Sequence, residues 1–214
     1  ELETVVMDWV ADLVGLPGVF KSHGRGGGVI QGTASESTLV ALLAARHRAM
    51  AAHGHGAAGR FVAYTSDQAH SSVQKACVIA GLDVATRFRK VATDPTTFAM
   101  SYSALEAAVE QDVRDGLIPI FCCANVGTTS SCAFDALPEI ADVCAQHGLW
   151  LHVDAAYGGA YACLPELSAR FAGTDRADSW CVNAHKKLLC PFDCAALYLA
   201  DRAPVIAALS VDSE

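Results

Sequence analysis

The sequence predicts an α/β fold in which a mainly parallel sheet is covered by helices on both faces. Short apolar runs alternate along the chain with segments of about ten residues that have helical periodicity, which is typical of β-α-β units. Polar residues suited to chemistry follow directly after several of the apolar runs, where ligands bind in sheets of this kind. The chain has 214 residues, enough for one sizeable core.

The helices are predicted from apolar spacing and from terminal signals. Apolar residues recur from Leu2 to Leu13 at helical spacing, and Gly15 and Pro17 end that pattern. Thr33 and Glu36 have the spacing of a capping box, which predicts a helix from there to about residue 52. Further helices are expected over residues 71–80, 104–114 and 137–147.

The strands are predicted from short apolar runs bounded by turn residues. They fall at residues 61–65, 84–88, 118–126, 149–155, 179–183 and 195–199. The glycine-rich stretch from Gly24 to Gly28 is expected to be a turn that leads toward the helix at Thr33. The sequence shows no repeat and no linker, so we expect one domain.

Composition excludes several classes of protein. Acidic residues outnumber basic ones by 23 to 15 without any basic stripe, so we expect no nucleic-acid partner. No apolar run approaches the roughly 18 residues of a membrane span, so we expect no membrane partner. The nine cysteines lack a C-x-x-C pair and favour reduced thiols in a cytoplasmic protein. His53 and His55 lack a third ligand nearby, so a flexible loop is expected there and no metal site.

Two places in the sequence could bind a charged group of a ligand, one an anion and the other a cation. Thr33, Ala34 and Ser35 follow the glycine-rich turn at a helix amino end, where free N–H groups and hydroxyls can cradle a phosphate. An ordinary capped helix is the alternative. Asp154 ends a very apolar strand, where a carboxylate needs a cationic partner such as a protonated pyridine nitrogen. A structural salt bridge or a helix cap would also explain Asp154.

Two further places could carry out chemistry. Lys186 follows another apolar strand and could form a Schiff base, although two adjacent lysines are more often solvated surface residues. His70 lies in the turn between a predicted strand and a predicted helix, where it could act in catalysis or simply cap the helix.

Together, these segments resemble the group II pyridoxal-phosphate (PLP) dependent decarboxylases, especially the aromatic-L-amino-acid decarboxylases. The resemblance runs over the whole chain. Its motifs are Glu1 to Thr4, Gln31 to Glu36, Ser66 to Ser72, Gly127 to Thr129, His152 to Tyr157, and Asn183 with His185 and Lys186. It implies that residues 1–214 form the large PLP-binding domain of a fold type I enzyme, incomplete at both ends, with a seven-stranded type of sheet. It also implies a homodimer for the full-length parent.

The resemblance assigns a role to individual residues. Lys186 would hold the cofactor as a Schiff base, Asp154 would keep the pyridine nitrogen protonated, and His70 would stack on the ring near the substrate. These three are the expected catalytic residues. The other expected cofactor contacts are Thr33, Ala34 and Ser35 for the phosphate, Asn183 on the phosphate side, His185 beside the lysine, Ala156 beneath the ring, Thr128 close by, and Ser179.

The implied reaction is decarboxylation of an aromatic L-amino acid to an amine and carbon dioxide, through an external aldimine. Two residues depart from the family pattern, because Ala184 stands where proline is usual and Lys187 where an aromatic residue is usual. One alternative is an aldehyde-forming relative that combines decarboxylation with oxidative deamination, a choice that depends on a mobile-loop tyrosine downstream of this region. The other is a non-catalytic protein that binds PLP or only a partner.

Overall fold

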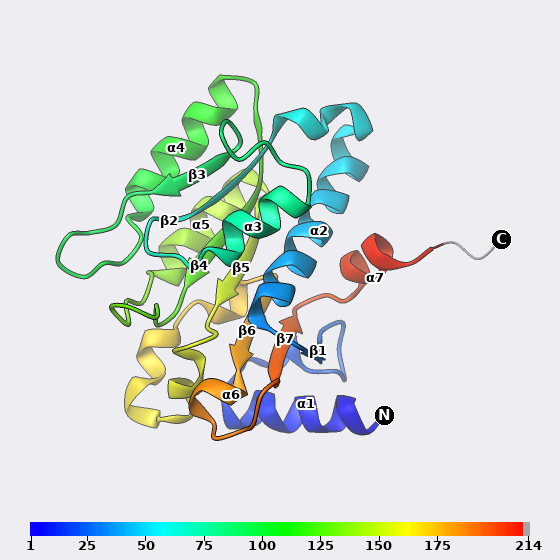
Figure 1. Ribbon diagram of the computed structural model, residues 1–214, viewed down its shortest axis with the longest axis vertical. Coiled ribbons are helices and arrows are strands. Elements are labelled where there is room, and N and C mark those ends of the chain that lie inside the picture. Colours follow the sequence, from blue (N-terminus) through cyan, green and yellow to red (C-terminus); the bar gives the residue numbers. More distant parts are fainter. Residues whose placement is uncertain (212–214) are drawn as a thin grey trace.

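A seven-stranded sheet forms the centre of the computed structural model, which describes residues 1–211 (Figure 1). Its strand order is β1-β7-β6-β5-β4-β2-β3. Strands β2 to β6 run parallel to one another, whereas β7 is antiparallel to both β6 and β1. The mainly parallel sheet is therefore confirmed. The strands are β1 (Gly27–Gln31), β2 (Phe61–Ser66), β3 (Phe88–Val91), β4 (Ile118–Asn125), β5 (Trp150–Asp154), β6 (Ser179–Asn183) and β7 (Ala195–Leu199).

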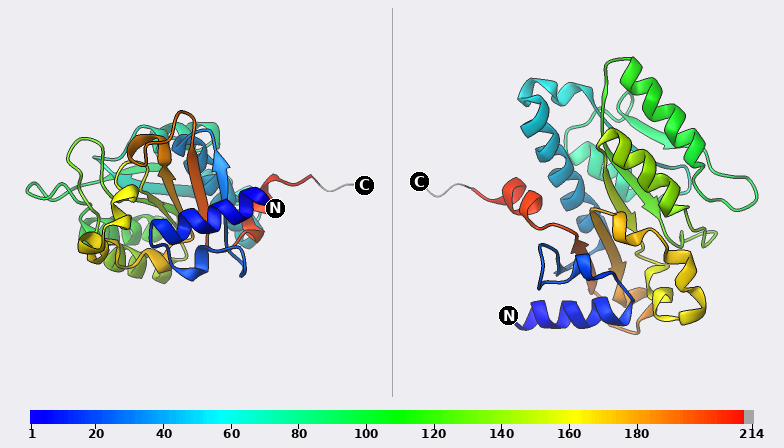
Figure 2. Two further views of the ribbon diagram at one scale, coloured as in Figure 1. Left: turned by 90° about the horizontal axis from the view of Figure 1, so that it is seen from below. Right: turned by 180° about the vertical axis from the view of Figure 1, so that it is seen from behind.

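Helices cover both faces of this sheet, as predicted. Helices α2 and α3 pack on one face, while α1, α4 and α5 pack on the other, which the view from behind in Figure 2 shows. The helices are α1 (Leu2–Leu13), α2 (Ala34–His53), α3 (Ser72–Ile79), α4 (Tyr102–Arg114), α5 (Leu137–His147), α6 (Ala184–Lys187) and α7 (Ala203–Leu209). Short 3-10 helices occupy Gly18–Phe20, His55–Arg60, Gly159–Cys163, Pro165–Phe171 and Thr174–Arg176.

Side-chain alternation along the strands divides the apolar interior into two layers. In β2, Phe61 and Ala63 pack toward α2 and α3, whereas Val62 and Tyr64 pack toward α4 and α5. Both faces of the parallel strands are buried, which explains why they read as continuous apolar runs in the sequence. Within residues 1–211, no helix is long and apolar enough to cross a bilayer.

Two predicted elements differ from the structure. The strand expected at residues 84–88 begins only at Phe88, because the Asp83 carboxylate accepts hydrogen bonds from Ala85 N–H and the Thr86 hydroxyl and holds a turn there. The glycine-rich stretch is not simply a turn, since Gly27 and Gly28 begin β1. A Cβ on Gly28 would lie 2.5 Å from a ring carbon of Tyr198, so glycine is needed for β1 to approach β7.

A histidine side chain is completely buried between the sheet and α2. His152 in β5 has no exposed surface and stacks on the Phe121 ring, with a centroid distance of 6.0 Å. Burial lowers the pKa of His152 from 6.5 to about 4. The folded protein therefore holds this imidazole neutral.

The buried histidine should make the folded state less stable in mild acid than at neutral pH. Between about pH 6.5 and pH 4 the unfolded chain binds a proton at residue 152 that the folded chain does not, so the free energy of unfolding must fall as the pH falls. We expect a loss of about 2 kcal/mol from pH 7 to pH 5 from this group. Urea denaturation of the wild type and of His152→Asn at both pH values measures it. If the free energy of unfolding falls equally in both proteins, the pH dependence does not come from His152.

Candidate functional site

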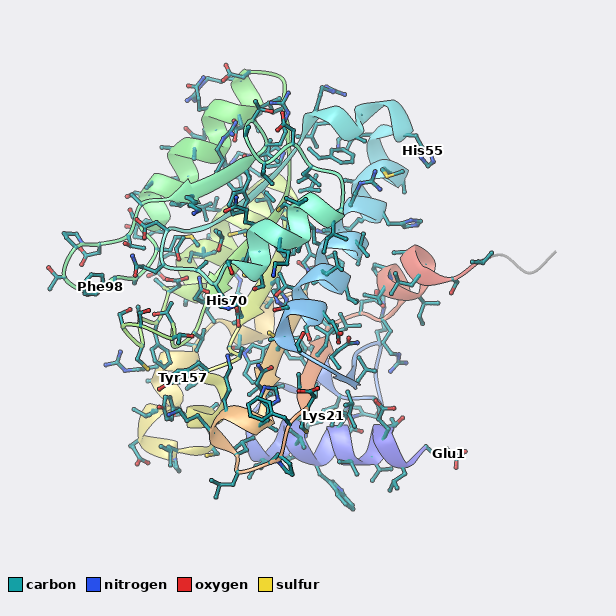
Figure 3. All side chains as sticks on the ribbon, in the orientation of Figure 1. Glu1, Lys21, His55, His70, Phe98 and Tyr157 are labelled. Atoms are coloured by element: carbon teal, nitrogen blue, oxygen red, sulfur yellow. The ribbon has the colours of Figure 1, made fainter. Side chains whose placement is uncertain are left out.

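A cavity of about 510 Å³ opens at the carboxyl ends of β2, β4, β5 and β6. The amino end of α2 closes one side of it, because β1 is parallel to those strands and delivers the chain to the same edge of the sheet. His70 and Tyr157, both labelled in Figure 3, belong to its wall. The walls consist of residues 33–35, 68–72, 125, 127–130, 154, 156–157, 183, 185–186 and 192–193. All predicted site residues except Ser179 are among them.

At the amino end of α2, the backbone N–H groups of Ala34 and Ser35 have no hydrogen-bond partner within residues 1–211, and both residues line this cavity. Thr33 is the N-cap, and its hydroxyl accepts a hydrogen bond from Glu36 N–H at 3.2 Å, while the Glu36 carboxylate accepts one from Thr33 N–H at 3.3 Å. The predicted capping box is therefore confirmed. Because the Thr33 side chain is used in the cap, Ala34 and Ser35 remain as the residues at the mouth of the helix. The glycines at positions 24–28 do not line the cavity.

Asp154 lies at the carboxyl end of β5 and faces the cavity. Its Oδ1 accepts a hydrogen bond from Ala156 N–H at 3.0 Å and a weak one from the Cys181 thiol at 3.8 Å. Within the described residues, no cationic side chain lies at ion-pair distance from this half-buried carboxylate. Since a partly desolvated carboxylate favours a cationic partner, the cavity is suited to a ligand that brings its own positive charge.

The two adjacent lysines point in different directions. Lys186 lines the cavity, but Lys187 does not. The Lys187 ammonium instead lies over the Tyr157 ring, 4.5 Å from its centroid. Neighbouring residues in a helix project about 100° apart, so the short helix α6 can aim only one of the two inward. The geometry thus singles out Lys186 as the amine that can meet a ligand.

Two histidines of the cavity wall are each held by a backbone N–H group. Ser72 N–H donates to Nδ1 of His70 at 3.1 Å, and Cys194 N–H donates to Nδ1 of His185 at 2.9 Å. A neutral imidazole whose Nδ1 accepts a hydrogen bond carries its proton on Nε2. His185 also stacks against Phe192, with ring centroids 4.6 Å apart. Both imidazoles are therefore fixed in orientation and in tautomer.

The last residue of β4 lines the cavity but is absent from the residues predicted from the sequence. Asn125 is buried, and its amide donates to the Ser66 hydroxyl at 3.2 Å. The buried Asp135 carboxylate accepts hydrogen bonds from Asn125 N–H and Met100 N–H, both at 2.6 Å, and holds the loop in place. Asn125 ends a very apolar strand just as Asp154 does, so the same signal could have identified it. Thr128 uses its hydroxyl within the loop, where it accepts from Ala133 N–H at 3.1 Å.

The loops after β4 and β5 touch through two glycines. A Cβ on Gly127 would lie 2.5 Å from the Gly158 Cα, and one on Gly158 would lie 2.4 Å from the Val126 carbonyl oxygen. Gly127 also has a φ of +77°, which side chains disfavour. This glycine crossing places the Thr128 segment against the segment that carries Ala156 and Tyr157.

Ser179 lies outside the site, which corrects its predicted cofactor contact. It is the first residue of β6 and is completely buried at the opposite end of the strand from Asn183. Its hydroxyl contacts Trp150 Nε1 and His152 Nδ1, each at 2.8 Å. Only the carboxyl ends of the parallel strands reach the cavity, so the start of a strand cannot contribute a ligand there.

Two further features of the described residues bear on the kind of site. No group of three or more histidine, cysteine, aspartate or glutamate side chains is arranged to hold a metal ion within residues 1–211. A second cavity of about 830 Å³ lies between α2, the end of α5 and the start of β4, away from Asp154 and Lys186. The first cavity is therefore the candidate site, because its polar groups converge on one space.

The family model of the pyridoxal-dependent decarboxylase conserved domain matches residues 1–214. The chain belongs to this decarboxylase family. The fold agrees, since the crystal structure of tryptophan decarboxylase from Catharanthus roseus in complex with L-tryptophan superposes with a TM-score of 0.95. The two sequences are 39% identical, and the superposition covers 100% of this chain and 46% of the Catharanthus roseus chain.

Family members with different products are equally similar to this chain. Phenylacetaldehyde synthase from Arabidopsis thaliana is 47% identical over 100% of this chain and 44% of its own length. Tryptophan decarboxylase 2 from Oryza sativa subsp. japonica is also 47% identical, over 100% of this chain and 43% of its own. The chain thus spans less than half the length of these family members.

Proposed function

We propose that the full-length protein binds pyridoxal phosphate at this cavity and decarboxylates an aromatic L-amino acid to the amine and carbon dioxide. One observation carries the proposal. Asp154 and Lys186 come from the ends of adjacent strands and face the same cavity, where the carboxylate has no cationic partner among the described residues. Family membership and the aromatic side chains Tyr157 and Phe192 in the cavity wall support the reaction and the substrate class.

The residues present fit this cofactor. Asn183 is buried at the end of β6, and its Oδ1 has no hydrogen-bond partner within the described part of the chain, so a ligand in the cavity would satisfy it. The N–H groups of Ala34 and Ser35 suit a phosphate, and Asp154 suits a pyridinium nitrogen. The cavity therefore offers a matching group for the phosphate, for the ring nitrogen and, in Lys186, for the aldehyde.

Pyridoxal phosphate, when bound, supplies an electron sink for the bond that breaks. The chain's own residues would do the rest. Asp154 would hold a proton on the ring nitrogen, and Lys186 would attach the aldehyde carbon through Nζ. His70, fixed with a proton on Nε2, would stack on the ring and present that N–H toward the substrate side. We propose that residues 1–214 serve as the large cofactor-binding domain and that the protein is cytoplasmic, which the nine free thiols support.

The test is to locate the attached cofactor. Borohydride reduction of the PLP-loaded protein, followed by peptide mapping, should leave the pyridoxyl group on Lys186. A label on Lys187 would refute the assignment of Lys186. A protein that takes up no PLP at all would refute the proposed function and favour a non-catalytic role.

The second candidate product is an aldehyde, because phenylacetaldehyde synthase is as similar to this chain as tryptophan decarboxylase 2. That reaction consumes dioxygen and water and releases aldehyde, ammonia, carbon dioxide and hydrogen peroxide. Incubating the full-length protein with a panel of aromatic amino acids distinguishes the two. Amine without peroxide supports decarboxylation, whereas aldehyde with an equal amount of peroxide supports the alternative.

We further propose a homodimer, and helix α1 supports it. Leu2, Val5, Trp9 and Leu13 form an exposed apolar stripe along α1, with Trp9 65% exposed. An apolar stripe on a helix favours association with another protein surface. We expect Trp9→Arg to shift the full-length protein from dimer to monomer in sedimentation velocity. Ile79→Arg on α3, which replaces a residue of similar exposure (61%), is the matched control and should leave the dimer intact. A dimer that survives Trp9→Arg would exclude this stripe as the interface.

A further inference from the structure

A buried line of hydrogen bonds connects the start of β6 to the first turn of α2. Trp150 Nε1 lies 2.8 Å from the Ser179 hydroxyl, which lies 2.8 Å from Nδ1 of His152. Nε2 of His152 lies 3.5 Å from the Thr38 hydroxyl, which donates to the Ala34 carbonyl at 3.0 Å. Trp150, His152, Ser179 and Thr38 are all fully or almost fully buried. No water or exposed group is needed to complete the line.

The groups at the two ends of this line indicate the direction of its hydrogen bonds. The Trp150 indole can only donate, so the Ser179 oxygen accepts from it, and the Ser179 hydrogen is left to point toward His152 Nδ1. At the other end the Ala34 carbonyl can only accept, so the Thr38 hydrogen points to it and the Thr38 oxygen must accept from His152. His152 therefore carries its single proton on Nε2. Burial, which lowers the pKa of His152 to about 4, keeps it in this neutral form.

The line ends at the carbonyl of a residue that lines the cavity. Ala34 is the first residue of α2 and lines the cavity beside Ser35. The capping box of Thr33 and Glu36 holds the end of α2 within its own segment, but it does not connect the helix to the sheet. The contact between Thr38 and His152 does connect α2 to the sheet, because His152 lies in β5, two residues before Asp154.

We propose that neutral His152, acting through Thr38, is a positioning residue that sets the distance between the amino end of α2 and the sheet. It thereby places the N–H groups of Ala34 and Ser35 where they can hold the cofactor phosphate while Asp154, on the same strand as His152, meets the ring nitrogen. The inference rests on the proposed function, because it concerns the same cofactor.

The test compares a ligand that has the phosphate with one that lacks it. Thr38→Val removes the hydroxyl and keeps the shape of the side chain. In the full-length protein we expect it to weaken binding of pyridoxal phosphate by about tenfold and binding of pyridoxal by less than about twofold. Thr38→Ser restores the hydroxyl and should restore the affinity. Thr65→Val is the matched control, since the Thr65 hydroxyl is also buried and donates to a backbone carbonyl, that of Cys123 at 2.9 Å, outside the line.

The outcomes separate positioning from general destabilisation. If Thr38→Val weakens both ligands equally, or no more than Thr65→Val does, His152 and Thr38 are structural only. Nitrogen NMR of the wild type checks the direction of these hydrogen bonds independently of any ligand, because it should show the His152 proton on Nε2. A proton on Nδ1 would overturn the inference. Failure of the wild type to bind pyridoxal phosphate would instead refute the proposed function.

Discussion

Lys186→Arg is expected to abolish turnover in the full-length protein, by on the order of a thousandfold or more. Arginine keeps the positive charge and much of the length of lysine, but its guanidinium stays protonated and cannot attack an aldehyde. The variant should therefore still bind pyridoxal phosphate while leaving no pyridoxyl label after borohydride reduction. Release of carbon dioxide from an aromatic amino acid, followed over time, measures the effect.

Lys187→Arg is the matched control for this experiment. The Lys187 ammonium lies over Tyr157 outside the cavity wall, and arginine can make the same contact with an aromatic ring. Turnover in this variant should stay within about threefold of the wild type, as expected for an exposed contact of this kind. If Lys187→Arg lost activity and Lys186→Arg kept it, the roles of the two lysines would be exchanged.

The second large effect is expected at Asp154. Asp154→Asn keeps the size of the side chain and its hydrogen bond from Ala156 N–H, but removes the negative charge that would face the ring nitrogen. We expect turnover to fall on the order of a hundredfold to a thousandfold, while the cofactor still attaches to Lys186. Carbon dioxide release and the pyridoxyl label measure the two properties separately. Turnover close to that of the wild type would show that Asp154 has only a structural role.

The sequence allowed much of this site to be predicted because each part depends on local signals. The capping box defines the start of α2, and the apolar runs before Asp154 and Lys186 define the strand ends at which those side chains emerge. Asn125 obeys the same rule and was overlooked. Ser179 violates it, since it begins its strand and lies at the other edge of the sheet.

The remaining features depend on contacts between distant segments. β1 is a strand although it begins with two glycines, because it must approach the Tyr198 ring closely, and no local pattern reveals that neighbour. The true start of β3 depends on how Asp83 folds its side chain over the following turn. The separation of Lys186 from Lys187 arises from a single turn of helix after β6.

The glycine crossing determines which walls of the cavity can change when the protein is adapted to a new substrate. Any side chain at Gly127 or Gly158 would push apart two loops that meet within van der Waals contact, and that would also displace Thr128 and Ala156. Those two walls are coupled and cannot be varied one at a time. Gln68 and Phe192 lie on separate loops that do not take part in the crossing. Libraries aimed at substrate choice should concentrate on these two positions and leave both glycines untouched.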